Sequence, residues 1–188
     1  AALDRHCAVE ACHTPIQGRK TPVPLVLLQG NIPQDEKFEP GSGVPMALQW
    51  YRDLLLQPHR ALVVAPETAL PLLPQQLPEG YLQGLQDHFA QPERAALIGL
   101  PLGSMEEGYT NSVMGLRAGQ SEAYRYDKHH LVPFGEFIPP LFRWFTDLMR
   151  IPLGDFNRGT LGQPTFDWRG ERFAPHICYE DLFGEELA

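Results

Sequence analysis

The chain has 188 residues, and 15 Lys and Arg against 23 Asp and Glu give it a formal net charge of −8 at pH 7. An acidic chain of this kind is not a polybasic binder of nucleic acid or of anionic lipid. Hydrophobic residues make up 43% of the chain, which is enough for a substantial buried core. Pro, Gln and charged residues interrupt every apolar run before the roughly 18 residues that a membrane-spanning helix needs. The sequence therefore predicts a soluble chain.

Residues 1–24 are predicted to be a linker, because they contain scattered Pro, Gly and charged residues and no periodic apolar face. Nothing in the first ten residues resembles a signal peptide. Two cysteines and two histidines lie in this segment: His6, Cys7, Cys12 and His13. Their spacing matches no zinc pattern, so we expect no metal site there. A disulfide between the two cysteines remains an alternative in an oxidising compartment.

Residues 25–188 are predicted to alternate between strands and helices. Short continuous apolar runs predict buried strands, and apolar residues at helical spacing predict helices. The expected strands are 25–29, 61–65, 95–100, 109–116, 122–126 and 173–178, and the expected helices are 44–57, 81–90 and 141–149. Continuous apolar strands are typical of a sheet covered by helices. In such sheets, functional groups gather where strands end.

Three residues with reactive side chains lie at or just beyond the ends of predicted strands. Cys178 ends the strand 173–178 and precedes a segment that can open a helix, where backbone N–H groups favour a thiolate. Glu67 and Lys128 follow two other strands, where they could serve as a general base and as a cation facing an oxyanion. Each residue also has an ordinary structural interpretation. Cys178 could be a buried cysteine, Glu67 a helix-cap acid and Lys128 a solvated charge in a turn.

Together the three side chains form the set that nucleophilic acyl transfer requires. The carboxylate takes the thiol proton, and the thiolate then attacks a carbonyl carbon. The lysine charge, with the N–H of Tyr179, stabilises the tetrahedral oxyanion. Because each group lies at a predicted strand end, we expect the three to converge on one site.

The sequences around these residues resemble the Glu-Lys-Cys motifs of the nitrilase, or carbon–nitrogen hydrolase, superfamily. The motifs are Ala-Pro-Glu-Thr-Ala around Glu67, Asp-Lys-His-His-Leu-Val-Pro-Phe-Gly-Glu-Phe-Ile-Pro around Lys128 and Ile-Cys-Tyr-Glu around Cys178. More narrowly, Gln-Gly-Asn-Ile-Pro at 29–33 and Leu-Val-Pro-Phe-Gly-Glu-Phe at 131–137 resemble the apolipoprotein N-acyltransferase branch rather than soluble amidases. The resemblance extends from residue 24 to residue 188.

The resemblance implies an α/β fold, a nitrilase-like αββα sandwich that is incomplete at its C-terminus, for a catalytic domain at 25–188. It implies membrane helices on both sides of this domain, which would face the periplasm from the bacterial inner membrane. The implied reaction moves an acyl chain from a phospholipid to Cys178 as a thioester, and then to the N-terminal amine of a diacylglyceryl apolipoprotein. It implies no cofactor and no metal.

The resemblance also assigns roles to residues. Glu67 is expected to be the general base, Lys128 the oxyanion-side cation and Cys178 the nucleophile. The expected supporting residues are Glu136, Tyr179 and Glu180. The expected substrate-binding residues are Phe38, Phe137 and Trp144; Phe38 stands where the family pattern has a tryptophan, so an indole N–H is lost there.

Two further points stay open at this stage. The apolar run 137–149 is interpreted as a lid or membrane-contacting segment, with a core helix as the alternative. The chain ends ten residues after Cys178, where the resemblance implies more strands, so we expect a fragment with an unpaired sheet edge. The alternative functions are a soluble nitrilase-type amidase that hydrolyses a small amide and a non-catalytic fragment that binds lipid or lipoprotein.

Overall fold

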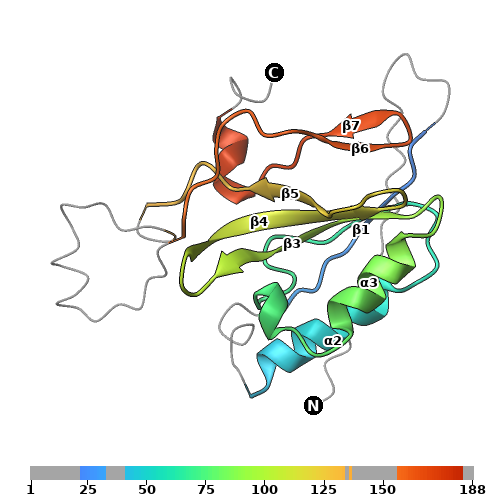
Figure 1. Ribbon diagram of the computed structural model, residues 1–188, viewed down its shortest axis with the longest axis horizontal. Coiled ribbons are helices and arrows are strands. Elements are labelled where there is room, and N and C mark those ends of the chain that lie inside the picture. Colours follow the sequence, from blue (N-terminus) through green and yellow to red (C-terminus); the bar gives the residue numbers. More distant parts are fainter. Residues whose placement is uncertain (1–21, 33–40, 134–135, 137–155, 184–188) are drawn as a thin grey trace, which may run out of the picture.

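The computed structural model describes residues 22–32, 41–133, 136 and 156–183. These residues form a mixed α/β domain with two helices, a five-stranded sheet and a two-stranded hairpin (Figure 1). Several predictions lie outside the described residues: the linker up to residue 21, the helix 141–149, and the substrate-binding candidates Phe38, Phe137 and Trp144.

The five strands of the main sheet follow one another in space in the same order as in the sequence. β1 (Leu25–Leu27), β2 (Leu62–Val64) and β3 (Ala95–Ser104) are parallel to one another. β4 (Gly108–Arg117) and β5 (Tyr124–Asp127) are each antiparallel to the preceding strand. The predictions of strands in these five places are confirmed, with ends that differ by a few residues.

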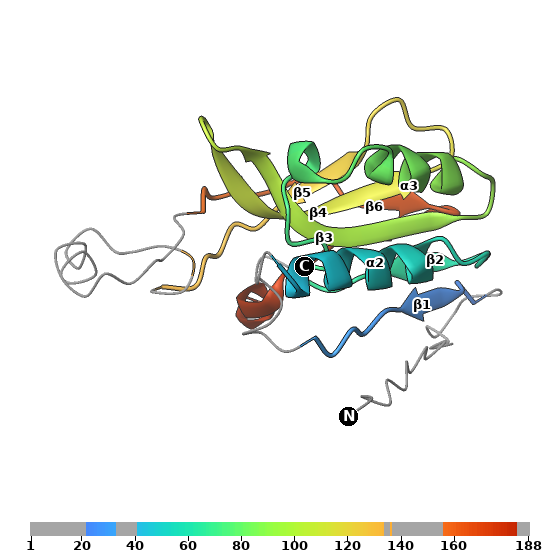
Figure 2. The same cartoon turned by 90° about the horizontal axis from the view of Figure 1, so that it is seen from below.

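Two helices connect the parallel strands and cover one face of the sheet. α2 (Gly43–Leu55) joins β1 to β2, and α3 (Tyr81–Phe89) joins β2 to β3, because parallel neighbours need a crossover connection. Leu55, Leu85 and Phe89 are almost completely buried in a core that alternate residues of β1 to β4 share. Figure 2 shows both helices in front of the sheet when the molecule is seen from below.

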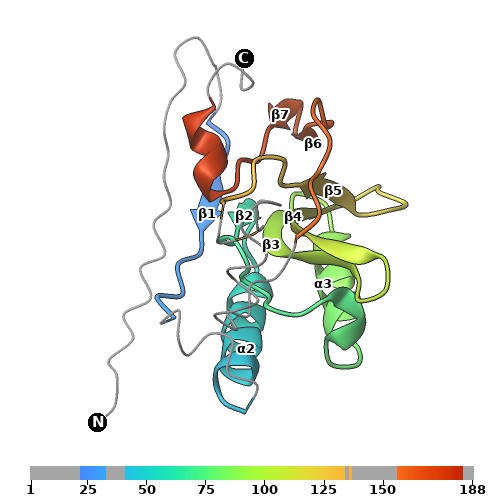
Figure 3. The same cartoon turned by 90° about the vertical axis from the view of Figure 1, so that its left-hand side faces the viewer.

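The opposite face of the main sheet carries a second, smaller sheet. β6 (Phe166–Trp168) and β7 (Glu171–Phe173) form an antiparallel hairpin. Phe166 and Trp168 belong to a second core cluster with Leu62, Ala95 and Leu97. Figure 3 shows the helices on one side of the sheet and this hairpin on the other. The described residues therefore contain one helical layer and strands of two packed sheets.

The predicted strand 173–178 is wrong. β7 ends at Phe173, and Cys178 begins a 3₁₀ helix that ends at Leu182. Pro175 has no N–H to donate to a neighbouring strand, and the N–H of Ile177 is donated to the side chain of Glu180 at 3.0 Å. Apolar character alone does not distinguish a strand from an extended segment whose hydrogen bonds go elsewhere.

Candidate active site

Glu67 lies in a tight turn that begins where β2 ends. The N–H of Leu70 donates to the carbonyl of Gly99 at 3.1 Å, which holds this turn against β3. A Cβ atom added to Gly99 would lie 2.8 Å from the Cα atom of Glu67 and would also overlap the Pro66 carbonyl. Thr68 has a φ of 50°, so the chain reverses within the turn. A glycine on β3 is therefore required for the backbone of Glu67 to approach the sheet this closely.

Lys128 directly follows β5, and its backbone is held on both sides. Its N–H donates to the carbonyl of Asn111 on β4 at 2.8 Å, and its carbonyl accepts the N–H of Gly159 at 2.9 Å. Only 1% of the Lys128 side chain is exposed. A buried ammonium requires anionic or hydrogen-bonding partners, and the structure supplies two carboxylates.

Those carboxylates belong to Glu67 and Glu136. The Nζ atom of Lys128 lies 2.8 Å from Glu136 Oε2 and 3.3 Å from Glu67 Oε1. Burial by itself lowers the pKa of Lys128, but the hydrogen bond to Glu136 and the negative charges of both glutamates outweigh it, so the pKa lies above its ordinary value. Lys128 is therefore a fixed cation at neutral pH.

Asn111 joins the same two carboxylates through a single amide nitrogen. Its Nδ2 atom donates to Glu67 Oε1 at 2.6 Å and to Glu136 Oε1 at 2.7 Å. The second oxygen of Glu136 also accepts the N–H of Val132 at 2.9 Å. Because an amide nitrogen carries two hydrogens, Asn111 can satisfy both contacts at once. Asn111 and Lys128, which are both buried, thus hold Glu136 and the partly exposed Glu67 in one network.

Sequence reasoning missed Asn111. The available signal was the run Thr110, Asn111 and Ser112, three polar residues in the middle of β4 that are all buried in the structure. Thr110 and Ser112 both donate to Asp127 Oδ1. Asn111 alternates with them along the strand and therefore faces the other side of the sheet. Only the pairing of strands shows which of the three meets Glu67.

Cys178 is exposed and is the first residue of its 3₁₀ helix. Its φ of 52° lies in the left-handed region, which few residues other than glycine adopt. A strained residue at a turn between an extended segment and a helix is a common way to present a nucleophile. It lines a cavity of about 490 Å³ on the sheet face opposite the helices, and Glu67 lines the same cavity.

The structure therefore connects the three predicted catalytic residues through Glu67. Its carboxylate contacts Lys128, and it shares a cavity with Cys178. The rest of the cavity wall is mostly apolar: Leu25, Leu62, Val64, Leu97, Val113, Phe173 and Ile177. The catalytic roles of the three residues stay predictions. Within the described part of the chain, no group of three or more His, Cys, Asp and Glu is arranged to bind a metal ion.

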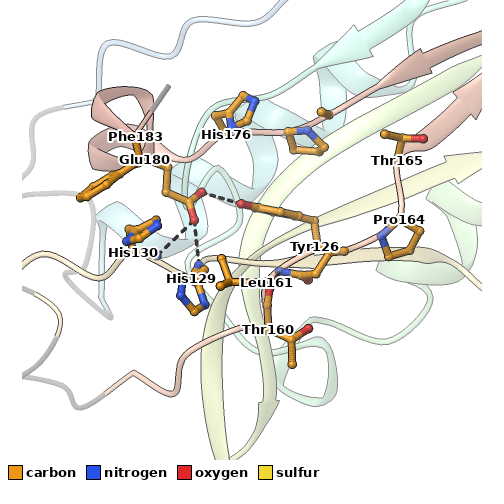
Figure 4. A pocket seen from close by; sticks show the side chains of 14 residues that line it. Tyr126, His129, His130, Thr160, Leu161, Pro164, Thr165, His176, Glu180 and Phe183 are labelled. Carbon is orange, nitrogen blue, oxygen red and sulfur yellow. Dashed lines mark hydrogen bonds between the residues drawn. The ribbon is translucent and has the colours of Figure 1, made fainter. Parts of the chain in front are cut away.

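Glu180 lies between the Cys178 turn and the segment at the end of β5. Glu180 is only 3% exposed, and its carboxylate accepts hydrogen bonds from both neighbouring segments, of which Figure 4 shows those from Tyr126, His129 and His130. The donors are the Tyr126 hydroxyl at 2.9 Å and the backbone N–H groups of His129 at 2.7 Å, His130 at 3.3 Å and Ile177 at 3.0 Å. The predicted supporting residue is thus a buried link between two chain segments.

Tyr179, the predicted supporting residue next to Cys178, lies within the 3₁₀ helix. Its ring meets that of Phe183 edge to face, with centroids 5.3 Å apart. The Phe183 ring in turn stacks on His130 at 3.8 Å. These ring contacts, like the hydrogen bonds of Glu180, join the Cys178 turn to the segment that follows Lys128.

Comparison with known proteins extends these observations. The chain is 63% identical over its whole length to the apolipoprotein N-acyltransferase of Verminephrobacter eiseniae, of which it covers 35%. It is 46% identical over 89% of its length to the corresponding protein of Ralstonia nicotianae, of which it covers 32%. No protein-family model matches the chain.

Solved structures give a more distant likeness. The glutamine-dependent NAD+ synthetase of Acinetobacter baumannii matches 77% of this chain and 26% of that protein, with a TM-score of 0.50 and 18% identity, which shows the fold. A CN-hydrolase superfamily protein of Xanthomonas campestris matches 74% of this chain and 49% of that protein, with a TM-score of 0.48 and 22% identity.

The expected fold class is confirmed: this is a nitrilase-like α/β domain. The expected resemblance is confirmed as well: along all or most of its length the chain is similar to proteins named apolipoprotein N-acyltransferase. It spans about a third of the length of the curated relatives that it matches.

Proposed function

We propose that this chain is the catalytic part of an enzyme that transfers an acyl chain from a phospholipid to the N-terminal amine of a diacylglyceryl apolipoprotein, through a thioester on Cys178. The observation that carries the proposal is the link formed by Glu67, which contacts the buried Lys128 and lines the same cavity as Cys178. The names of the relatives support the acyl transfer and the kind of acceptor.

In the first half-reaction, Glu67 accepts the thiol proton and the Cys178 sulfur attacks the ester carbonyl carbon of the phospholipid. The carbonyl oxygen becomes an oxyanion, which the fixed charge of Lys128 and the N–H of Tyr179 stabilise. The intermediate collapses with cleavage of the ester C–O bond. The departing alkoxide takes the proton from Glu67 and leaves as a lysophospholipid, and the acyl group stays on sulfur.

In the second half-reaction, the amine of the acceptor attacks the thioester carbonyl carbon and gives its proton to Glu67. The C–S bond breaks, an amide forms, and the thiolate recovers the proton from Glu67. The same three groups therefore serve both steps in turn. The enzyme returns to its starting state without any cofactor in the reaction.

Glu136 and Asn111 keep this machinery in its working arrangement. Without a second carboxylate, Lys128 would neutralise Glu67 alone and would be free to close onto it. With Glu136 at 2.8 Å, the ammonium has a nearer partner than Glu67 at 3.3 Å. Glu67 can then bind a proton while Lys128 stays ionised.

Substrate contacts and location complete the proposal. Phe38, Phe137 and Trp144, which lie outside the described residues, are the substrate-binding residues of this proposal. The domain at 25–188 faces the periplasm from the inner membrane, anchored by helices of the complete protein. Among the described residues, no helix is long and apolar enough to cross a bilayer. The similarity to apolipoprotein N-acyltransferases, of which the chain covers about a third, is the support for this placement.

The test uses a protein with the full length of the curated relatives and measures which products it forms. Enzyme, phospholipid vesicles and a diacylglyceryl peptide are mixed, and lysophospholipid and triacylated peptide are measured by mass spectrometry. Both products should form with the native enzyme and with Cys12→Ala, and neither with Cys178→Ala. Ammonia release from a small amide without triacylated peptide would instead support the amidase. Peptide binding that is unchanged in Cys178→Ala, with no product from any variant, would support the non-catalytic fragment.

A further inference from the structure

Two segments that carry predicted catalytic residues are bound to one carboxylate. Tyr126, His129 and His130 flank Lys128 in the sequence, and Ile177 directly precedes Cys178. All four donate a hydrogen bond to Glu180. The carboxylate therefore contacts the chain on both sides of the lysine and immediately before the cysteine.

The two oxygens of Glu180 divide these donors. Oε1 accepts the N–H groups of His129 and His130, and Oε2 accepts the hydroxyl of Tyr126 (Figure 4). Oε2 also accepts the N–H of Ile177. Hydrogen bonds to an ionised and buried acceptor are among the strongest in proteins. On Oε2, the Tyr126 hydroxyl and the N–H beside the nucleophile converge on the same atom.

The strand β5 is the rigid member of this pair of segments. Tyr126 is paired with Val113 of β4 in the antiparallel ladder. The Cys178 turn has no such ladder, since residues 174–177 pair with no strand among the described residues. The left-handed Cys178 keeps its conformation only if its surroundings determine it. Glu180 supplies that determination by fixing the turn to β5.

We propose that Tyr126 is a positioning residue for the acyl transfer, acting through Glu180 to hold the Cys178 turn at a fixed place relative to Lys128. The expected effect on acyl transfer rests on the proposed function. The fixed position of the Cys178 turn rests on the four hydrogen bonds to Glu180. Tyr126 also lines a small cavity of about 130 Å³ with His129, His176 and Phe183. Its hydroxyl points across this cavity to Glu180 (Figure 4).

The variant Tyr126→Phe removes the hydroxyl and keeps the ring. A matched control is Tyr124→Phe, because Tyr124 lies on the same strand and its hydroxyl donates to the carbonyl of Pro164 at 2.7 Å instead of to Glu180. Both substitutions are introduced into a protein that has the full length of the curated relatives. Steady-state acyl transfer from a phospholipid to the diacylglyceryl peptide gives kcat and KM, and hydrogen exchange gives the protection of the amides of residues 129, 130 and 177.

In Tyr126→Phe, kcat should fall about tenfold, because a charge-assisted hydrogen bond is lost. The KM for the phospholipid should stay within about twofold, because this bond lies away from the surface that binds the phospholipid. Amide exchange should become faster in both segments together. In Tyr124→Phe, neither should change. When Glu180→Gln is present, Tyr126→Phe should have little further effect on kcat, because the two residues act as one unit.

Equal kcat values for Tyr126→Phe and Tyr124→Phe would overturn the inference, as would full additivity with Glu180→Gln or a change confined to KM. A change in KM alone would mean that the Tyr126 hydroxyl binds substrate in the small cavity. If the native enzyme forms no acyl adduct, the proposed function fails, and the exchange data still decide whether Tyr126 joins the two segments.

Discussion

Lys128 and Glu136 form a buried ion pair, with 2.8 Å between Nζ and Oε2. Glu136 is separated from Lys128 by only eight positions in the sequence but lies outside every strand and helix, and its N–H donates to the carbonyl of Val132. The segment after β5 therefore turns back so that its carboxylate reaches the lysine. The pair keeps the ammonium of Lys128 ionised beside the general base proposed at Glu67.

The first prediction concerns pH dependence. In Glu136→Gln, Lys128 loses the charge-assisted hydrogen bond that raises its pKa most, together with the negative charge of Glu136, so its pKa falls. The lysine then loses its charge at a lower pH, and the alkaline limb of the pH–rate profile for acyl-enzyme formation should move to lower pH. The exposed Glu107→Gln is the control and should leave the limb in place. An unmoved limb in Glu136→Gln would show that Lys128 does not need Glu136 to stay charged.

The second prediction concerns stability. Lys128→Met leaves two carboxylates without their shared cation, so we expect a loss of about 3 kcal/mol in the free energy of unfolding at neutral pH. Because the folded-state pKa of Lys128 is raised, its contribution is fully present below its unfolded pKa and is lost as pH rises through the folded one. Denaturant unfolding at pH 5 to 11 measures it. If the difference in free energy of unfolding between the native protein and Lys128→Met grew at alkaline pH, it would contradict this account.

The third prediction concerns Asn111. Replacing Asn111 with Asp removes both N–H donors and adds a third carboxylate to the network, so like charges face one another. Acyl-enzyme formation should fall at least about tenfold, since each lost hydrogen bond to a charged group costs roughly 1.5–3 kcal/mol. Asn111→Leu should fall less because it adds no charge. Asn157→Asp, at an exposed amide, is the control; a similar rate for all three variants would remove Asn111 from the site.

The fourth prediction concerns Gly99. In Gly99→Ala the new methyl group must displace the turn that carries Glu67, which we expect to cost about 1–3 kcal/mol and to lower kcat. Gly84→Ala is the control, since Gly84 lies within α3 with nothing within 4 Å of an added Cβ. That substitution should stabilise the chain by about 0.5–1 kcal/mol. Thermal unfolding with activity on the same samples separates the two, and a fully active Gly99→Ala would contradict the tight approach.

The fold was largely predictable up to β5 because its strands are short apolar runs and its helices show clear periodicity. Local sequence also placed Glu67 and Lys128 at the ends of β2 and β5. The segment before Cys178 was mispredicted as a strand, since an apolar extended chain looks the same whether or not a neighbouring strand accepts its hydrogen bonds. Long-range pairing, which the sequence does not display, decides that question.

The partners of the proposed catalytic residues were the least predictable part of the site. Asn111 meets Glu67 across 44 residues, and Tyr126 meets Glu180 across 54. Neither contact leaves a local pattern, because each depends on which strands lie side by side and on which face a side chain emerges. Glu136 was found through its motif. Its contact with Lys128 depends on how the chain turns back after β5.

The most direct test of the central claim is intact-mass spectrometry of the full-length enzyme incubated with phospholipid and no acceptor. The account predicts an added acyl mass on the peptide that contains Cys178, removed by hydroxylamine as a thioester and transferred when the diacylglyceryl peptide is added. It also predicts no adduct in Cys178→Ala or Glu67→Gln. An adduct that persists in Cys178→Ala, or a native enzyme that transfers acyl chains without ever carrying one, would contradict it.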